Sequence, residues 1–293
     1  MTATATVPTT ETLEVPGARL SYDVRRNDQS TKPILFLIAS PMGAAGFGTL
    51  AGHFTDRTVV TYDPRGSDRS KLTEPTIPPT PEEHAADVHR IIAGLGGQPV
   101  DLFANSGGAV NALALVAEHP DEVRTLIAHE PPLPSVLPDR EAALAAARAV
   151  HETYEQRGWG AGMAHFITLV GHRGEVLADF AQQTGPDPAM FGMPAEDDGS
   201  RTDPLLALAL VGSIEYEPDF DALRAASTRI IMAAGAESEG ELANRGAFAV
   251  AERLGTEPVI FPGNHAGFLG GEYGQTGDPD AFAAKLRDVL VEG

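Results

Sequence analysis

The sequence predicts an α/β fold in which helices pack on a mostly parallel, doubly wound sheet. Short continuous apolar runs, typical of strands buried on both faces, alternate along the chain with segments of helical pattern. Alternation of this kind favours a parallel α/β architecture over separate all-helical or all-strand domains. A long helical stretch near the middle of the chain interrupts the alternation and predicts an inserted helical cap.

The predicted strands are of two kinds. Residues 18–26 alternate apolar and polar side chains, as a half-buried antiparallel strand does. The buried strands are expected in short runs rich in Ile, Leu, Val and Phe, at Ile34–Ser40, Thr58–Tyr62, Val100–Asn105, Val123–His129, Arg229–Ala234 and Pro258–Phe261.

Helices are expected between these strands, at Pro81–Leu95, Gly107–His119, Gly240–Leu254 and Asp278–Val291. The first of them has the clearest end signals. Thr80 can cap it, Pro81 suits its first position, and two glutamates follow in its first turn. Glycines close the same helix from Gly94 onward.

The interruption defines the expected domain organisation. A core is predicted from residues 1–131 and 222–293, with a helical cap or lid inserted at 132–221. An independent second domain is the alternative interpretation of the insertion. Residues 1–12, rich in Thr and Ala, are expected to form a flexible tail.

Within the cap, helices are expected at Arg140–Arg157 and Ala161–Gly171, followed by a loop at 185–204 that is dense in Gly, Pro and Asp. The only tryptophan, Trp159, lies between the two helices. It would either line a substrate pocket or anchor the cap to the core, and the sequence does not distinguish these roles.

Composition and charge narrow the function classes. Lys and Arg total 21 against 41 Asp and Glu, and the resulting charge of −20 disfavours nucleic-acid and membrane-surface partners. The absence of cysteine excludes disulfides, thiolate nucleophiles and Cys-ligated metal sites. No secretory signal or bilayer-spanning apolar run is evident, so a cytoplasmic protein is expected, with its oligomeric state open to a homo-oligomer.

Ser106 is the sharpest candidate for chemistry. It lies where a buried strand is expected to run directly into a helix, flanked by Ala104 and Gly108, whose small size would let strand and helix approach closely. A tight turn there would lift the serine hydroxyl clear of the sheet, and the first helical amide could donate to an oxyanion. A serine that merely caps the helix is the alternative interpretation.

A serine nucleophile needs a base, and nine histidines are available. His265 is singled out because it follows the last predicted strand, in the string Phe261–Phe268. A loop in that position presents an imidazole at the carboxyl edge of the sheet, which is also the edge expected for Ser106. A solvated loop histidine is the alternative.

These features together resemble the α/β-hydrolase family over nearly the whole chain. The strand order, the turn at Ser106, the insertion after the strand ending at His129 and the late His265 all match. Asp63–Ser70 is similar to the D-x-R-G-x-G-x-S turn of the family, with Asp68 in place of the second glycine. The resemblance implies an α/β-hydrolase fold and acyl chemistry.

Two departures from the family pattern affect the site. Ala104 replaces the first glycine of G-x-S-x-G, and Ser40–Gly43 replaces the usual His-Gly pair after the third strand. By its position in the resemblance, the second segment would complete an oxyanion hole, with the backbone N–H of Met42 joining that of Gly107. Pro41 has no N–H to offer. A glycine-rich connector is the alternative.

The triad acid has two candidate positions. The family usually places an aspartate shortly after the strand that ends here at Gly235, but this chain has Ser238 there, with Glu237 and Glu239 as nearby substitutes. Glu130 follows the strand before the cap, where haloalkane dehalogenases and zearalenone lactonases keep their acid. The lactonase type also has a His-Glu-x-Pro string and a Pro-Gly-x-His loop, so Glu130 is favoured and Glu237 is the alternative.

The sequence therefore predicts a serine hydrolase that cleaves a small to medium carboxylic ester or lactone through an acyl-enzyme. Amidase, C–C hydrolase or acyltransferase chemistry and a non-catalytic ligand-binding relative are the alternatives. No cofactor or metal is expected. The glycines from Gly43 to Gly48 have the wrong order for a dinucleotide site, and there is no His-Glu-x-x-His string.

Overall fold

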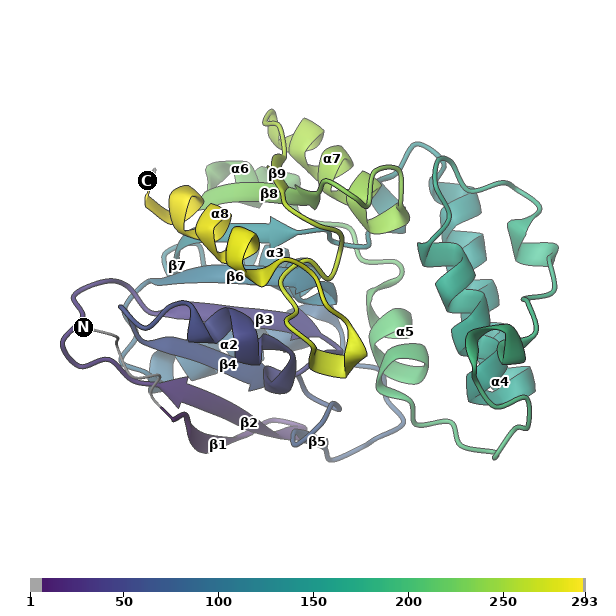
Figure 1. Cartoon of the computed structure of the whole chain (residues 1–293), viewed down its shortest axis with the longest axis horizontal. Coiled ribbons are helices and arrows are strands. Elements are labelled where there is room, and N and C mark those ends of the chain that lie inside the picture. Colours follow the sequence, from purple (N-terminus) through teal and green to yellow (C-terminus); the bar gives the residue numbers. More distant parts are fainter. Residues whose placement is uncertain (1–6, 292–293) are drawn as a thin grey trace.

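A computed structural model describes residues 7–291. Within this range nine strands form a single sheet in the order β1-β2-β4-β3-β6-β7-β8-β9, with β5 pairing with β2 (Figure 1). Their bounds are β1 Thr9–Val15, β2 Ala18–Arg25, β3 Leu35–Ser40, β4 Val59–Asp63, β5 Lys71–Leu72, β6 Val100–Ser106, β7 Val123–His129, β8 Arg229–Gly235 and β9 Val259–Phe261. The predicted fold class, an α/β hydrolase with a mostly parallel sheet, is confirmed.

The amino-terminal edge of the sheet differs from the prediction of a flexible tail over residues 1–12. Thr9–Val15 forms β1, which pairs antiparallel with β2 along its whole length. β1 was hard to recognise because its residues are mostly Thr and Glu and none of its side chains is fully buried. Residues 1–6 of the expected tail lie outside the described part of the chain.

Helices cover both faces of the sheet. One face packs against α2 Pro81–Gly94, α3 Gly107–Glu118, α6 Phe220–Ala225 and α7 Leu242–Leu254. The other face packs against α1 Gly48–Gly52 and α8 Pro279–Val291. At the start of α2, the Thr80 side chain and Glu83 form the reciprocal hydrogen bonds of a capping box, as the end signals in the sequence indicate.

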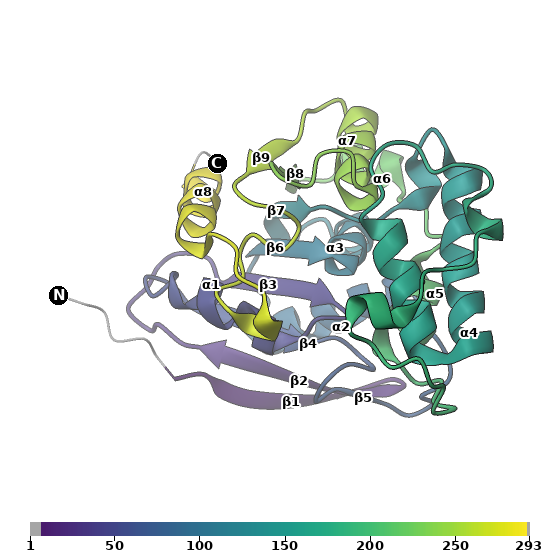
Figure 2. The same ribbon diagram turned by 45° about the vertical axis from the view of Figure 1, so that its right-hand side comes forward.

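The segment expected to form the cap is helical and lies beyond the carboxyl ends of β3, β6 and β7 (Figures 1 and 2). It contains the long helix α4 Arg140–Val170, a π-helical turn at Pro204–Ala209 and α5 Leu210–Ser213. These elements share an apolar cluster built around Tyr154 and Leu206, to which Leu242 of α7 also belongs. The cluster therefore joins the inserted segment to the core helix α7.

The long helix is not continuous. Gly158 has φ 83° and ψ −177° and breaks α4 into the two parts that the sequence predicts as separate helices. A Cβ at Gly158 would collide with the side chain of Asp197, which comes from the cap loop. Trp159 follows the break, packs on the cap cluster and donates a 3.0 Å hydrogen bond to Asp203. Within the described residues, no helix is both long and apolar enough to cross a bilayer.

Candidate active site

Ser106 occupies a strained turn between β6 and α3. Its backbone has φ 56° and ψ −130°, a region that a non-glycine residue rarely adopts. The two following glycines make this turn possible. A Cβ on Gly107 would lie 2.7 Å from the carbonyl oxygen of Ser40, and one on Gly108 would lie 2.5 Å from Cα of Ala39. The helix therefore begins in direct contact with β3, and the serine is held at the carboxyl edge of the sheet.

Glu130 occupies a second strained position, directly after β7. Its φ is 50°, its backbone N–H donates to Ala233 at 3.0 Å, and its side chain is fully buried. Strain at a buried charged residue persists only where surrounding contacts hold it, which makes this position a functional candidate. The turn aims the carboxylate back across the end of β8 rather than out to solvent.

Donors surround the Glu130 carboxylate. Oε1 accepts hydrogen bonds from the Gly235 backbone at 2.8 Å, from the Ser238 hydroxyl, and from Asn244 at 3.3 Å. Oε2 lies 2.7 Å from Nδ1 of His265. Burial would raise the pKa of Glu130, but the hydrogen bonds and nearby imidazoles outweigh it and hold this pKa at about 2. The group is therefore a carboxylate at neutral pH.

This contact also sets the tautomer of His265. A carboxylate only accepts hydrogen bonds, so the proton of the neutral imidazole must lie on Nδ1, which leaves Nε2 as an acceptor. The ring lies in a loop fastened to the end of β8, where Glu237 N donates to Gly263 O at 3.0 Å. About a third of the His265 side chain is exposed, so its free nitrogen is accessible to a ligand.

The alternative acid is placed differently. The side chain of Glu237 is exposed, while its backbone carbonyl accepts a hydrogen bond from Arg173 at 2.8 Å. Among the described residues, Glu130 is the carboxylate that bonds His265. Ser238, which stands where the family usually has its aspartate, donates to that carboxylate instead.

The segment proposed for the second oxyanion donor lies beside the turn that holds Ser106. Ser40 pairs with Ser106 at the ends of β3 and β6, so the loop that follows Ser40 through Met42 adjoins the start of α3. Asp63 holds this loop, since its Oδ1 accepts from Ala44 N at 2.8 Å. The backbone amides of Met42 and Gly107 are thus on neighbouring segments of one edge.

The Asp63–Ser70 turn supports the same loop. Asp63 Oδ2 is paired with the guanidinium of Arg69, and Ser70 donates to the Asp63 carbonyl at 2.7 Å. Asp68, where the family has glycine, adopts φ 45° and faces Gly43 of the loop. Burial and the neighbouring Asp63 charge raise the pKa of Asp68. The Asp63–Ser70 turn therefore supports the loop that contains Met42, the candidate for the second oxyanion donor.

His129 is a neighbour of the site that sequence reasoning did not identify. Its Nδ1 lies 2.7 Å from the Asn105 side-chain oxygen, and burial lowers its pKa to about 4, so the ring is neutral. Its ring centroid lies 6.2 Å from that of His265. The aromatic rings around it are those of Phe103, Phe261 and Phe282. The signal available in the sequence was its position directly before Glu130.

Two groups of side chains within the described residues have the donor types and spacing of a metal site. One consists of His129, Glu130 and His265, in which the Glu130 oxygens already accept from Gly235, Ser238, Asn244 and His265. In this group His129 Nε2 is buried and has no hydrogen-bond partner among the described residues. The other group lies at the opposite end of β7.

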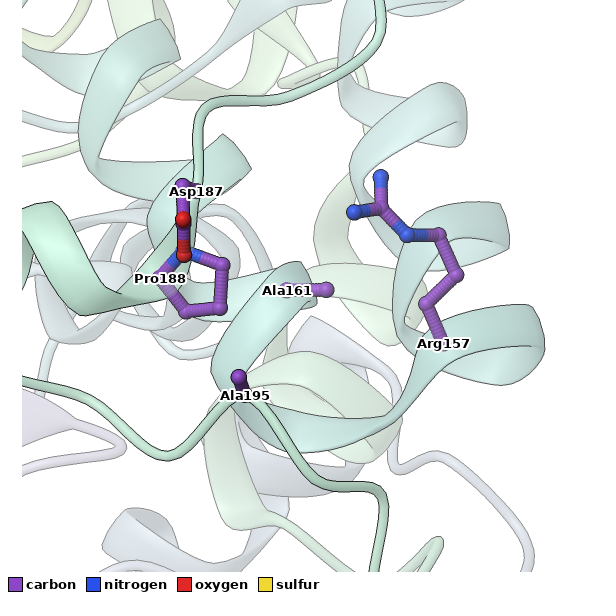
Figure 3. Close-up of a pocket in the computed structure, with 5 residues that line it drawn as sticks. All are labelled: Arg157, Ala161, Asp187, Pro188 and Ala195. Atoms are coloured by element: carbon purple, nitrogen blue, oxygen red, sulfur yellow. The ribbon is translucent and has the colours of Figure 1, made fainter.

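The inserted helical segment at 132–221 contains two hollows. The larger, of about 530 Å³, is lined by Arg157, Ala161, Asp187, Pro188 and Ala195, with the Arg157 guanidinium and the Asp187 carboxylate on different walls (Figure 3). The smaller, of about 250 Å³, includes His165 and Phe180 in its lining. Neither is lined by Ser106, Glu130 or His265. Both are lined only by residues of the segment expected to form the cap.

Comparison with known proteins identifies the family of the chain. Residues 32–160 match the family model described as alpha/beta hydrolase fold. The chain is 33% identical to the uncharacterized hydrolase YraK of Bacillus subtilis strain 168, over 95% of both chains.

Two solved structures share the fold. A thermophilic esterase from Thermogutta terrifontis superposes with a TM-score of 0.64 at 20% identity, covering 98% of both chains. A carboxylesterase structure from Nitrososphaera gargenis superposes with a TM-score of 0.66 at 16% identity, covering 97% of this chain and all of the other. The full-length match to YraK and the shared architecture lead to one conclusion: the chain belongs to the α/β-hydrolase family.

Proposed function

We propose that the protein is a serine hydrolase that cleaves small to medium carboxylic esters or lactones through an acyl-enzyme intermediate. The observation that carries the proposal is the 2.7 Å contact between His265 Nδ1 and Glu130 Oε2, at the sheet edge that also holds Ser106 in its strained turn. The esterase names of the two structural neighbours support the choice of an ester bond.

The reaction begins with attack of the Ser106 hydroxyl on the substrate carbonyl. Nε2 of His265 accepts the hydroxyl proton, and the buried Glu130 carboxylate stabilises the imidazolium that forms. The backbone N–H groups of Met42 and Gly107 donate to the tetrahedral oxyanion. His265 then protonates the leaving alkoxide and activates water, which hydrolyses the acyl-enzyme.

A lactone follows the same route, except that the leaving alkoxide stays tethered to the acyl group. The position of Glu130 before the cap is the feature shared with zearalenone lactonases, and it is the reason to include lactones beside linear esters. Amidase, C–C hydrolase and acyltransferase activities use the same groups with other leaving groups or acceptors.

The test is hydrolysis of p-nitrophenyl acetate and butyrate, together with labelling by an active-site-directed phosphonate. Wild type should turn over these esters and react with the phosphonate, and Ser106→Ala should lose both. Turnover should fall in acid, because a protonated His265 cannot accept the serine proton. Ester turnover that survives in Ser106→Ala would contradict the mechanism. If the phosphonate did not label the wild type, a non-catalytic ligand-binding relative would be favoured.

A further inference from the structure

A second cluster of imidazole and carboxylate side chains lies far from the candidate active site. It consists of His89, His119 and Glu122, each of which offers a ligand atom within 4.8 Å of the others. Glu122 directly precedes β7, whereas Glu130 directly follows it. Eight residue steps of about 3.3 Å each separate Glu122 from Glu130 by roughly 26 Å. The proposed hydrolysis makes no use of this cluster.

The backbone holds these three residues in place. His119 caps the end of α3, and the backbone N–H of Glu122 donates to the His119 carbonyl at 3.2 Å, which closes a tight turn. The carbonyl of Glu122 in turn accepts from Val100 N at 2.9 Å, at the start of β6. His89 reaches the turn from α2, which packs beside α3. Two segments, α2 and the turn between α3 and β7, thus present their side chains to one point.

The side chains are arranged in an unusual way for a solvated surface. The imidazoles of His89 and His119 are stacked, with ring centroids 4.0 Å apart and planes within 4° of parallel. His89 Nδ1 lies 2.7 Å from Glu122 Oε1. The other carboxylate oxygen, Glu122 Oε2, is buried and has no hydrogen-bond partner among the described residues. A buried acceptor of this kind costs free energy unless something binds it.

From this geometry we propose that His89, His119 and Glu122 bind a divalent metal ion of the class that includes Zn²⁺, Cu²⁺ and Ni²⁺. A site with two imidazoles and one carboxylate binds these ions in preference to Mg²⁺ or Ca²⁺, because Mg²⁺ and Ca²⁺ prefer oxygen ligands alone. Ligand atoms on one zinc ion lie about 3.3 Å apart, and an imidazole binds a metal in the plane of its ring. The two stacked rings must therefore turn out of their parallel arrangement so that both nitrogens point at one ion.

The ion binds Glu122 Oε2, the carboxylate oxygen without a hydrogen-bond partner, and replaces the proton between His89 and Glu122. Water completes its coordination, because the His89 side chain is about a third exposed. The net charge of −20 further favours cation binding over anion binding. A bound ion would tie α2, the end of α3 and the start of β7 together at the edge opposite the active site, and so would stabilise the fold without entering the reaction.

The experiment titrates untagged, chelator-treated protein with Zn²⁺ by calorimetry. Wild type should bind one ion, and His119→Ala should weaken the dissociation constant at least about tenfold. Glu122→Gln, which keeps the shape of the side chain, provides a second variant should His119→Ala fail to fold. His172→Ala is the matched control, since His172 is engaged with the Glu175 carbonyl instead, and its affinity should equal that of wild type.

Two further readouts locate the ion. Cu²⁺ bound to wild type should show coupling to two imidazole nitrogens in its paramagnetic resonance spectrum, and His89→Ala should reduce this to one. Saturating Zn²⁺ should raise Tm by about 2–4 °C in wild type and not in Glu122→Gln. Ester turnover should be the same in wild type and His119→Ala, so these results do not depend on the proposed hydrolysis.

Binding that is unchanged in both His119→Ala and Glu122→Gln would overturn the proposal. So would Zn²⁺ binding that disappears in His265→Ala, because that result would place the ion at the other histidine and glutamate cluster. Absence of Zn²⁺ and Cu²⁺ binding to wild type at millimolar metal would also overturn it.

Discussion

At the scale of single residues, the Glu130 carboxylate carries most of the chemical argument. It is fully buried, it accepts hydrogen bonds from three donors besides His265, and its pKa is held at about 2. A charge so well satisfied stays ionised over the whole pH range in which the protein would work. It can therefore orient His265 and balance the imidazolium without taking up the proton itself.

Glu130→Gln is expected to lower kcat by roughly 10³–10⁴-fold, because an amide cannot balance the imidazolium and can hold the wrong tautomer of His265. Steady-state kinetics on p-nitrophenyl butyrate measure the change, with circular dichroism to establish folding. Glu237→Gln is the matched control and should leave kcat unchanged, since its side chain is exposed. A loss confined to Glu237→Gln would reassign the acid.

The roles of Ser238 and His129 could not be predicted from the sequence for a physical reason. Ser238 donates to a carboxylate 108 positions earlier, and His129 contacts Asn105 across two neighbouring strands. No local sequence pattern predicts contacts of this kind, because they depend on which strands are neighbours in the folded sheet. Ser106 and His265 were recognisable because each lies in a short stretch of sequence whose small residues indicate a tight backbone turn.

At the scale of elements, the turn that holds Ser106 depends on how closely α3 approaches β3. Gly108 lies against Ala39 with no room for a Cβ, and Gly107 lies against Ser40. The predicted strands and helices of the core were recoverable from apolar runs and caps, since burial on both faces imposes those runs. The π-helical turn at Pro204–Ala209 was not, because it begins where the predicted loop at 185–204 ends and lies outside both predicted cap helices.

Gly108→Ala is expected to lower the free energy of unfolding by about 1–3 kcal/mol and to reduce activity, because the new Cβ would lie 2.5 Å from Cα of Ala39 and push α3 away from β3. Urea denaturation and ester turnover measure the two effects. The matched control is Gly94→Ala, at the end of α2, where a Cβ meets nothing within 4 Å. That variant should be neutral or slightly stabilised, and equal destabilisation of the two would contradict the close-packing account.

At the scale of the whole molecule, buried histidines and a large negative charge govern the response to conditions. His84 and His129 are both fully buried, and burial lowers their pKa values to about 3 and about 4. Below pH 6.5 the unfolded chain protonates these histidines while the folded protein does not. Stability is therefore lost as the pH falls from about 6.5, by about 1.4 kcal/mol per pH unit for each histidine.

His84→Asn should make this dependence shallower by about 1.4 kcal/mol per pH unit between pH 6.5 and 5, because one buried titrating group is removed. Urea denaturation at several pH values measures the slope. Above pH 7 the variant and wild type should show the same dependence, even if their absolute stabilities differ. An unchanged slope below pH 6.5 would mean that His84 titrates equally in the folded and unfolded states.

The net charge of −20 should also discriminate among substrates. A p-nitrophenyl ester whose acyl chain ends in a carboxylate is expected to have a lower kcat/KM than its neutral counterpart of equal length at low salt. Raising the ionic strength from about 0.01 to about 1 M shortens the screening length from about 30 to about 3 Å and should narrow the gap. Preference for the anionic ester at low salt would contradict this expectation.

The strand that presents Glu130 precedes the cap, but every side chain and backbone group that satisfies its carboxylate comes after the cap. During synthesis on the ribosome, Ser106 and Glu130 emerge long before Gly235, Ser238, Asn244 and His265. A nascent chain therefore holds an unpaired acid and an unassisted serine until nearly the whole sequence has been made. The order of the polypeptide thus delays assembly of the candidate site until the core around it can close.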